Sequence, residues 1–141
     1  MFEVVYYSLP GNTTRIAKII ADELGVQAES IKSKAELAQD SCLFLGYGGN
    51  PWSKLPEFIA RNDLKGREVV LFGTSGEDAD EGVREIEEML KPIGAIIISR
   101  FYCKRRASPI FNWGHPNDEE IAGTRDFAGK IKGSHQDNPS N

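Results

Sequence analysis

The chain contains four short, continuous runs of apolar residues that do not alternate with polar residues. They are Val4–Tyr7, Leu43–Leu45, Val69–Phe72 and Ile96–Ile98. Continuous runs of β-branched, aromatic or leucine residues of this length are typical of strands covered on both faces, as in a parallel sheet. We expect a fifth, weaker strand over Val26–Ile31.

Between these runs, apolar residues recur with helical spacing. The stripes are Ile16, Ile20 and Leu24; Leu55, Phe58 and Ile59; Val83, Ile86, Leu90 and Ile93; and Ile121, Ala128 and Ile131. Gly25 and Gly94 follow two of the stripes, where a left-handed residue commonly ends a helix. The sequence therefore predicts helices in the connections between strands.

We expect the order strand–helix–strand–short helix–strand–helix–strand–helix–strand–helix. Alternation of this kind predicts an α/β fold, a parallel sheet with helices on both faces. One domain is expected over residues 1–132, and the polar segment Gly133–Asn141 is expected to be a flexible tail.

The length and the net charge of the chain limit the classes of function that it can have. A chain of 141 residues suits one domain, and its net charge of -4 argues against general nucleic-acid binding. No apolar run approaches the roughly 20 residues that span a bilayer. Met1–Ser8 leads directly into a strand-like run, without the pattern of a signal peptide. We expect a cytoplasmic protein with neither nucleic acid nor membrane as its partner; monomer and dimer both stay open.

The two cysteines, Cys42 and Cys103, form neither a disulfide framework nor a zinc set. In the expected sheet they lie at opposite edges, separated by about 15–20 Å of strand rise. A disulfide requires Cα atoms within about 7 Å of each other. We expect Cys42 in the core, and we expect no metal site, because His115 and His135 lack partners at metal-ligand spacing.

The position of a ligand site follows from the fold class, because open parallel sheets bind ligands outside the carboxyl ends of their strands. That rule selects four segments, which are Ser8–Thr13, Gly46–Trp52, Gly73–Asp78 and Cys103–Pro116. Three of them combine glycine with hydroxyl or amide residues. Their backbone N–H groups can approach a ligand closely.

The first segment joins a strand directly to a helix, whose free N–H groups and dipole favour an anion. Ser8, Asn12, Thr13 and Thr14 could add side-chain donors. Neither the GxxxxGK[ST] pattern nor the GxGxxG pattern is present. Two interpretations stay open: a small phosphate held without a cation, or a capped turn of the kind that any α/β protein needs.

Five pieces of the chain, in order, resemble the flavodoxin family. They are Val5–Ser8 running into Gly11–Thr13, Phe44–Gly46, Val70–Gly76, Phe101–Cys103 and Gly114–Asn117. The resemblance extends to about Lys132. It implies a flavodoxin-like three-layer sandwich whose five-stranded parallel sheet has the order 2-1-3-4-5. It further implies non-covalently bound FMN and electron transfer with redox partner proteins, a reductase donor and an acceptor enzyme.

The resemblance also implies a set of cofactor-binding residues. For the phosphate they are Ser8, Pro10, Gly11, Asn12 and Thr13, and for the ring Tyr47, Gly48, Gly49, Asn50, Trp52, Thr74, Ser75, Gly76, Glu77 and Cys103. Trp52, or else Tyr47, would stack on the ring, while Thr74–Gly76 would meet its polar edge. The alternatives are a packing role for Trp52, a flexible turn at 74–76, and a solvated first helical turn for the acidic residues from Glu77 onward.

Pro10 is a departure from the hydroxyl-rich phosphate loops of flavodoxins. Proline has no N–H to donate, so the segment would offer a phosphate fewer hydrogen bonds. A charge-assisted hydrogen bond is typically worth about 1.5–3 kcal/mol. The loss of one would weaken FMN binding by about tenfold or more.

Three functions are compatible with these features. The first is an FMN-binding electron carrier that has no substrate of its own. The second is a flavin-dependent reductase of quinones, on the same fold, with a nicotinamide donor. The third is a flavodoxin-like binding module that has lost flavin, for which Pro10 is the best support.

Overall fold

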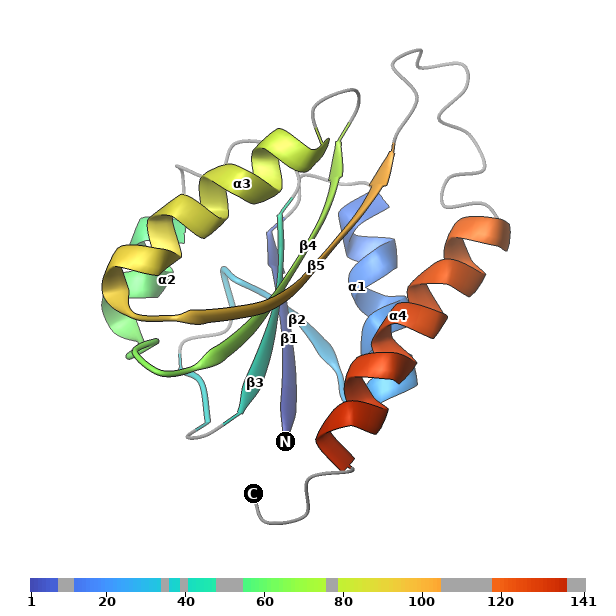
Figure 1. Cartoon of the computed structure of the whole chain (residues 1–141), viewed down its shortest axis with the longest axis horizontal. Helices are drawn as coiled ribbons and strands as arrows, with labels where there is room; N and C mark the ends of the chain where they lie inside the picture. The colour runs from blue at the N-terminus through green and yellow to red at the C-terminus, as the bar shows by residue number, and fades with distance from the viewer. Residues whose placement is uncertain are drawn as a thin grey trace.

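The computed structural model describes residues 1–7, 12–33, 36–38, 41–47, 55–75, 79–104 and 118–136. Five strands and four α-helices follow one another along these residues (Figure 1). The strands are β1 (Phe2–Tyr7), β2 (Ala28–Ser30), β3 (Cys42–Tyr47), β4 (Glu68–Ser75) and β5 (Ile96–Lys104). The helices are α1 (Asn12–Leu24), α2 (Leu55–Arg61), α3 (Ala79–Leu90) and α4 (Asp118–Gln136), with a 3₁₀ turn, η1, over Lys91–Ile93.

The strands form one sheet in the order β2-β1-β3-β4-β5, and every neighbouring pair is parallel. All five expected strands are present, and the predicted order is confirmed. The β1–α1–β2 connection places β2 on one side of β1, and β3, β4 and β5 follow on the other side, so the strand order reverses between β1 and β3. This reversal is the point at which doubly wound sheets open a crevice for ligands.

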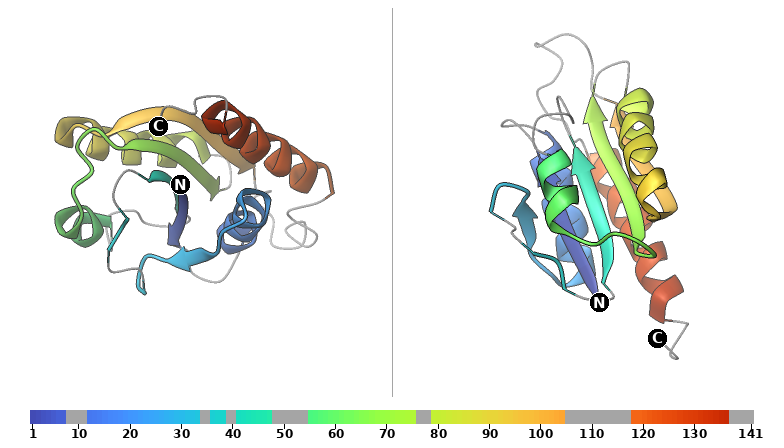
Figure 2. Two further views of the ribbon diagram at one scale, coloured as in Figure 1. Left: turned by 90° about the horizontal axis from the view of Figure 1, so that it is seen from below. Right: turned by 90° about the vertical axis from the view of Figure 1, so that its left-hand side faces the viewer.

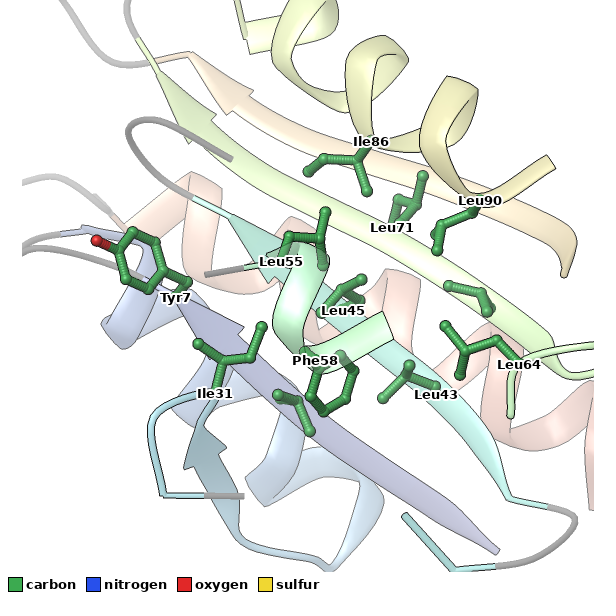
Figure 3. Packing of buried hydrophobic residues seen from close by; sticks show 12 residues of the cluster. Tyr7, Ile31, Leu43, Leu45, Leu55, Phe58, Leu64, Leu71, Ile86 and Leu90 are labelled. Atoms are coloured by element: carbon green, nitrogen blue, oxygen red, sulfur yellow. The ribbon is translucent and has the colours of Figure 1, made fainter. Parts of the chain in front are cut away.

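Helices cover both faces of the sheet, giving three layers (Figure 2). On one face, Leu55 and Phe58 of α2 and Ile86 and Leu90 of α3 pack on a buried cluster (Figure 3). On the other face, residues of α1 and α4 pack around Phe44 and Phe72. The three central strands β1, β3 and β4 are thereby covered on both sides, as their unbroken apolar runs predict.

Helix α1 shows how the predicted stripes are used. Ile16, Ile20 and Leu24 are all buried against the sheet, which confirms this stripe. The helix ends at Gly25, whose φ of 75° is the left-handed conformation that favours glycine. The chain then returns directly into β2, beside β1.

The edge strand β5 departs from the expectation of burial on both faces. Ile96 and Ile98 expose 50% and 37% of their surface. The register pairs Val69 with Ile97 and Val70 with Ser99, so Ile98 is skipped. Farther along, Phe101 stacks on Phe127 of α4, with ring centroids 4.7 Å apart. The prediction is therefore wrong for the two exposed isoleucines, because the strand lies at an edge and bulges there.

The stripe of α3 also ends earlier than predicted. Ile86 and Leu90 are buried, but Ile93 is exposed. The chain tightens into η1 after Leu90, with Pro92 in its first turn. A 3₁₀ turn has three residues per turn rather than 3.6, which takes Ile93 off the stripe. Gly94, with φ 90°, closes the turn as expected.

The expected order also contains a short helix between β2 and β3, and this expectation is wrong for the described residues of that connection. Residues 31–33 form a turn, and 36–38 have no regular secondary structure. The Leu37 N–H donates to Asn62 Oδ1 at 2.9 Å, and the Ala38 N–H donates to a carboxylate oxygen of Glu3. Side chains thus satisfy backbone groups here. The predicted stripe of Leu55, Phe58 and Ile59 is confirmed as α2, after β3.

Helix α4 continues through Gly133 to Gln136, four residues beyond the domain boundary expected at Lys132. Its Arg125 bonds to Asp22 of α1, with Nη1 and Oδ2 2.9 Å apart. Residues 137–141 of the expected tail lie outside the described part of the chain. In that part, no helix is long and apolar enough to cross a bilayer.

Candidate functional site at the carboxyl edge of the sheet

The ladder of the sheet brings the carboxyl ends of four strands to one edge. Tyr7, the last residue of β1, pairs with Tyr47, the last residue of β3. Tyr47 pairs in turn with Gly73, and Gly73 with Tyr102. In Figure 1 this edge lies at the top, where α1 and α4 also begin. The fold therefore brings together the strand ends at which the four segments selected from the sequence begin.

Several expected loop residues belong to strands instead. Tyr47 ends β3, Thr74 and Ser75 end β4, and Cys103 lies in β5. Thr74 pairs with Cys103, and Ser75 with Lys104. The backbone of these residues is held by the sheet, so the edge of a ligand site built on them is set by strand pairing. β1 ends where the sequence predicts, but β3, β4 and β5 continue two or three residues past the predicted starts of their loops, because the ladder continues through glycine and hydroxyl residues.

The helix that follows β1 begins at Asn12, five positions after Tyr7. Asn12 and Thr13 are its first residues, as expected for a helix start near a ligand. No acidic residue lies in its first turn. Its N–H groups and the positive end of its dipole are therefore not offset locally by a carboxylate, and the helix start remains suited to an anion.

The remaining predicted site residues lie outside the described part of the chain. They are Ser8, Pro10, Gly11, Gly48, Gly49, Asn50, Trp52, Gly76 and Glu77. All of them follow β1, β3 or β4 directly in the sequence. Their roles at the site therefore stay predictions.

The layer beneath the edge is tightly packed. A β-carbon built on Gly46 would lie 2.2 Å from Cε2 of Phe72, on the neighbouring strand. Phe72 is fully buried. Gly46, expected to open a ligand loop, is therefore a strand residue whose missing side chain leaves room for the Phe72 ring.

Ion pairing fixes α3 to the middle of β5, where Arg100 pairs with Leu71. The Arg100 guanidinium of β5 donates to both carboxylate oxygens of Glu87 on α3, with Nε 2.8 Å from Oε2. Lys91 Nζ lies 3.5 Å from the same carboxylate. The hydrogen bond from Arg100 is the main cause that lowers the pKa of Glu87, and it raises the pKa of Arg100. Glu87 is thereby held ionised although it is 7% exposed.

A contact that sequence reasoning missed lies at the end of β1. Lys32 Nζ lies 5.6 Å from the centroid of the Tyr7 ring. Lys32 follows the short strand β2, which pairs only with β1. A signal was present in the sequence, because a lysine directly after a strand adjacent to β1 must reach the same edge, but the strand was too weak to fix its end.

The cysteines lie at opposite edges, as expected. Cys42 pairs with Phe2 at the amino edge, and Cys103 with Thr74 at the carboxyl edge. Cys42 is buried, which confirms its place in the core. Burial is the main cause that raises the pKa of its thiol to about 12, so the thiol stays protonated and unreactive at neutral pH.

Comparison with known proteins supports the fold. No family model matches the chain. Uncharacterized protein MJ0298 of Methanocaldococcus jannaschii is 27% identical over 134 residues, which cover 85% of this chain and 89% of that protein.

Several solved structures with the same architecture are flavodoxins. A flavodoxin from the domain Archaea matches with a TM-score of 0.67 at 19% identity, covering 94% of this chain and 96% of its own. A short-chain flavodoxin associated with a bacterial microcompartment matches with a TM-score of 0.66 at 20% identity, covering 94% and 97%. Two-electron reduced Megasphaera elsdenii flavodoxin matches with a TM-score of 0.60 at 23% identity, covering 92% and 99%. The chain has the flavodoxin-like fold.

Proposed function

We propose that the protein binds FMN at the carboxyl edge of its sheet and carries electrons between partner proteins. The observation that carries this proposal is the junction from β1 to α1. A central strand ends at Tyr7 and a helix without an acidic residue in its first turn begins at Asn12, at the strand-order reversal. That junction suits a phosphate, and the structural neighbours, flavodoxins, point to a flavin.

The proposed roles follow the strands. Ser8, Pro10, Gly11, Asn12 and Thr13 surround the phosphate, with the backbone N–H groups of the helix start and the Thr13 hydroxyl as donors. Trp52 or Tyr47, following or ending β3, covers a face of the ring. Gly48, Gly49, Asn50 and residues 74–77 meet its polar edge, and Cys103 lies beside it.

Bound flavin supplies the one- and two-electron redox chemistry. This chain's part is to hold the phosphate, limit water access to the ring and set the field around it. The ladder beneath the site supports that role, because β4 and β5 stay paired through Ser75 and Lys104. A rigid edge keeps the backbone hydrogen-bonding groups of Thr74 and Ser75 in place when the charge of the ring changes.

The proposed cofactor is tested by an absorption spectrum of the purified protein. We expect flavin bands, and we expect the cofactor released on denaturation to run as FMN on chromatography. Release of FAD would contradict the interpretation of the short β1–α1 junction. A colourless protein that does not take up added FMN would support the module without flavin.

The electron-carrier role is tested by steady-state turnover. An electron carrier should show little oxidation of NADH or NADPH with a quinone, because it has no site for the nicotinamide donor. It should pass electrons from an added flavodoxin reductase to cytochrome c. Rapid turnover of the nicotinamide with quinone alone would instead identify a flavin-dependent reductase.

A further inference from the structure

The turn after β2 is fixed against the carboxyl end of β1. The Ile31 N–H donates to the Tyr6 carbonyl at 2.7 Å, so pairing with β1 continues to the start of the turn. The Ser30 hydroxyl accepts from the Lys32 N–H at 3.2 Å, and the Ser30 carbonyl accepts from the N–H and the hydroxyl of Ser33. These bonds hold the Lys32 backbone at the edge proposed to bind the cofactor.

The Lys32 side chain turns toward β1. Its Nζ lies 5.6 Å from the centroid of the Tyr7 ring, within the range of a cation–π contact. Tyr7 is buried, whereas Lys32 is exposed. Figure 3 shows Tyr7 at one end of its cluster near Ile31, with the hydroxyl turned away from the other labelled side chains. The ring thus keeps the ammonium next to the last residue of β1.

The adjoining segment has no cation of its own. Between Tyr7 and Arg15 the sequence contains no lysine or arginine. An anion bound there would be neutralised by backbone N–H groups and the helix dipole alone. Lys32 lies outside that segment, but the sheet order brings its charge to the end of β1, from which the segment continues, because β2 lies directly beside β1.

We propose that Lys32 is a specificity determinant of the cofactor site, whose ammonium favours flavin with a phosphate over flavin without one. This inference rests on the proposed FMN function. FMN carries a negatively charged phosphate and riboflavin does not, so a charge acting on the phosphate must separate the two ligands. Its effect must also weaken as salt is added, because exposed charges are screened.

The experiment titrates FMN and riboflavin into the apoprotein and follows the quenching of flavin fluorescence. Lys32→Gln removes the charge and Lys32→Arg keeps it. The matched control is Lys65→Gln, since Lys65 is an exposed lysine in the turn before β4, at the opposite edge of the sheet. Arg15→Gln removes the cation nearest to the segment in the sequence. Circular dichroism checks the fold of each variant.

We expect Lys32→Gln to raise the Kd of FMN about three- to tenfold at low salt, as for one partly screened charge, while riboflavin changes less than about twofold. Lys32→Arg and Lys65→Gln should bind FMN like the wild type. The difference between Lys32→Gln and wild type should shrink in high salt.

Three outcomes would overturn the inference alone. In the first, Lys32→Gln binds FMN as tightly as Lys65→Gln does. In the second, Lys32→Gln loses as much affinity for riboflavin as for FMN, which would assign Lys32 to packing on Tyr7. In the third, only Arg15→Gln loses affinity for FMN. Wild-type protein that binds neither flavin would overturn the proposed function as well.

Discussion

Gly46 lies in a strand between two others, where Tyr6 and Phe72 are its neighbours in the ladder. Alanine there would bring Cβ to 2.2 Å from the Phe72 ring, far inside contact distance. We expect Gly46→Ala to lower the free energy of unfolding by about 1–3 kcal/mol, the usual cost of overpacking a core. Urea unfolding followed by circular dichroism measures this.

Gly123 provides the matched control for this substitution. It lies inside α4, and an added β-carbon would meet nothing within 4 Å. Gly123→Ala should therefore raise the free energy of unfolding, by about 0.5–1 kcal/mol, because alanine loses less entropy in a helix. Equal effects at the two glycines would show that the Phe72 ring can move aside without cost.

Thr13 is the residue whose position best links sequence and proposed chemistry. It is the second residue of α1, the helix that follows β1. Thr13→Ala should weaken FMN binding by about 1–3 kcal/mol, because it removes a hydrogen bond to a charged group. Isothermal titration with FMN measures the change. Riboflavin is the control, since an equal loss for both ligands would place Thr13 away from the phosphate.

At the scale of elements, the contact between α3 and β5 depends on protonation. The Arg100 hydrogen bond lowers the pKa of Glu87 in the folded state below its ordinary value near 4.5. A carboxyl with a lowered folded pKa stabilises the fold above its unfolded pKa, and this stabilisation is lost as the pH falls through the folded pKa. The pair should therefore weaken only in acid, below about pH 4.5.

Glu87→Gln tests this dependence. We expect it to lower the free energy of unfolding at pH 7 by about 1 kcal/mol, a modest value because Arg100 is 46% exposed. Below the pKa of Glu87 the free energies of unfolding of the variant and the wild type should converge. The free energy of unfolding of the variant should therefore fall less steeply in acid than that of the wild type. Denaturant unfolding at several pH values measures both.

Glu88→Gln serves as the control for Glu87→Gln, because it removes the same charge from an exposed neighbour on α3. It should leave stability nearly unchanged. If Glu88→Gln reproduced the pH dependence of Glu87→Gln, the effect would come from net charge and not from the contact with Arg100.

The elements also show what a single sequence can and cannot predict. The runs of β1, β3 and β4 predict central strands because burial on both faces leaves no polar alternation to obscure them. Ile96 and Ile98 have the same composition but lie on an edge strand with a bulge, and an apolar run carries no information about its neighbours. The segment between β2 and β3 was mispredicted because side chains of Asn62 and Glu3, distant in sequence, bond its backbone.

The candidate site was predictable to a similar degree. Strand order brings the ends of β1, β3 and β4 to one edge, and α1 begins at Asn12, where the sequence predicts a helix start. Thr74, Ser75 and Cys103 were expected in loops, and strand pairing extends through them. Lys32 was missed because its contact with Tyr7 depends on the pairing of β2 with β1, which a three-residue strand signals only weakly.

At the scale of the whole molecule, the parallel sheet gives the protein two chemically different edges. The amino edge holds Phe2 paired with Cys42, whose thiol is protonated and buried. The carboxyl edge holds the ends of β1, β3, β4 and β5 and the start of α1. Among the residues that the structure describes, the combination of an α-helix start with glycine and hydroxyl residues lies at the second edge, so the account places every cofactor contact there.

The most direct test of this placement is a titration of isotopically labelled apoprotein with FMN, followed by the backbone amide signals in two-dimensional NMR. We predict large shifts at Asn12, Tyr47 and Ser75, which end or begin elements at the carboxyl edge, and negligible shifts at Phe2 and Cys42 at the amino edge. Shifts centred on the amino edge, or no shifts at saturating FMN, would contradict the account.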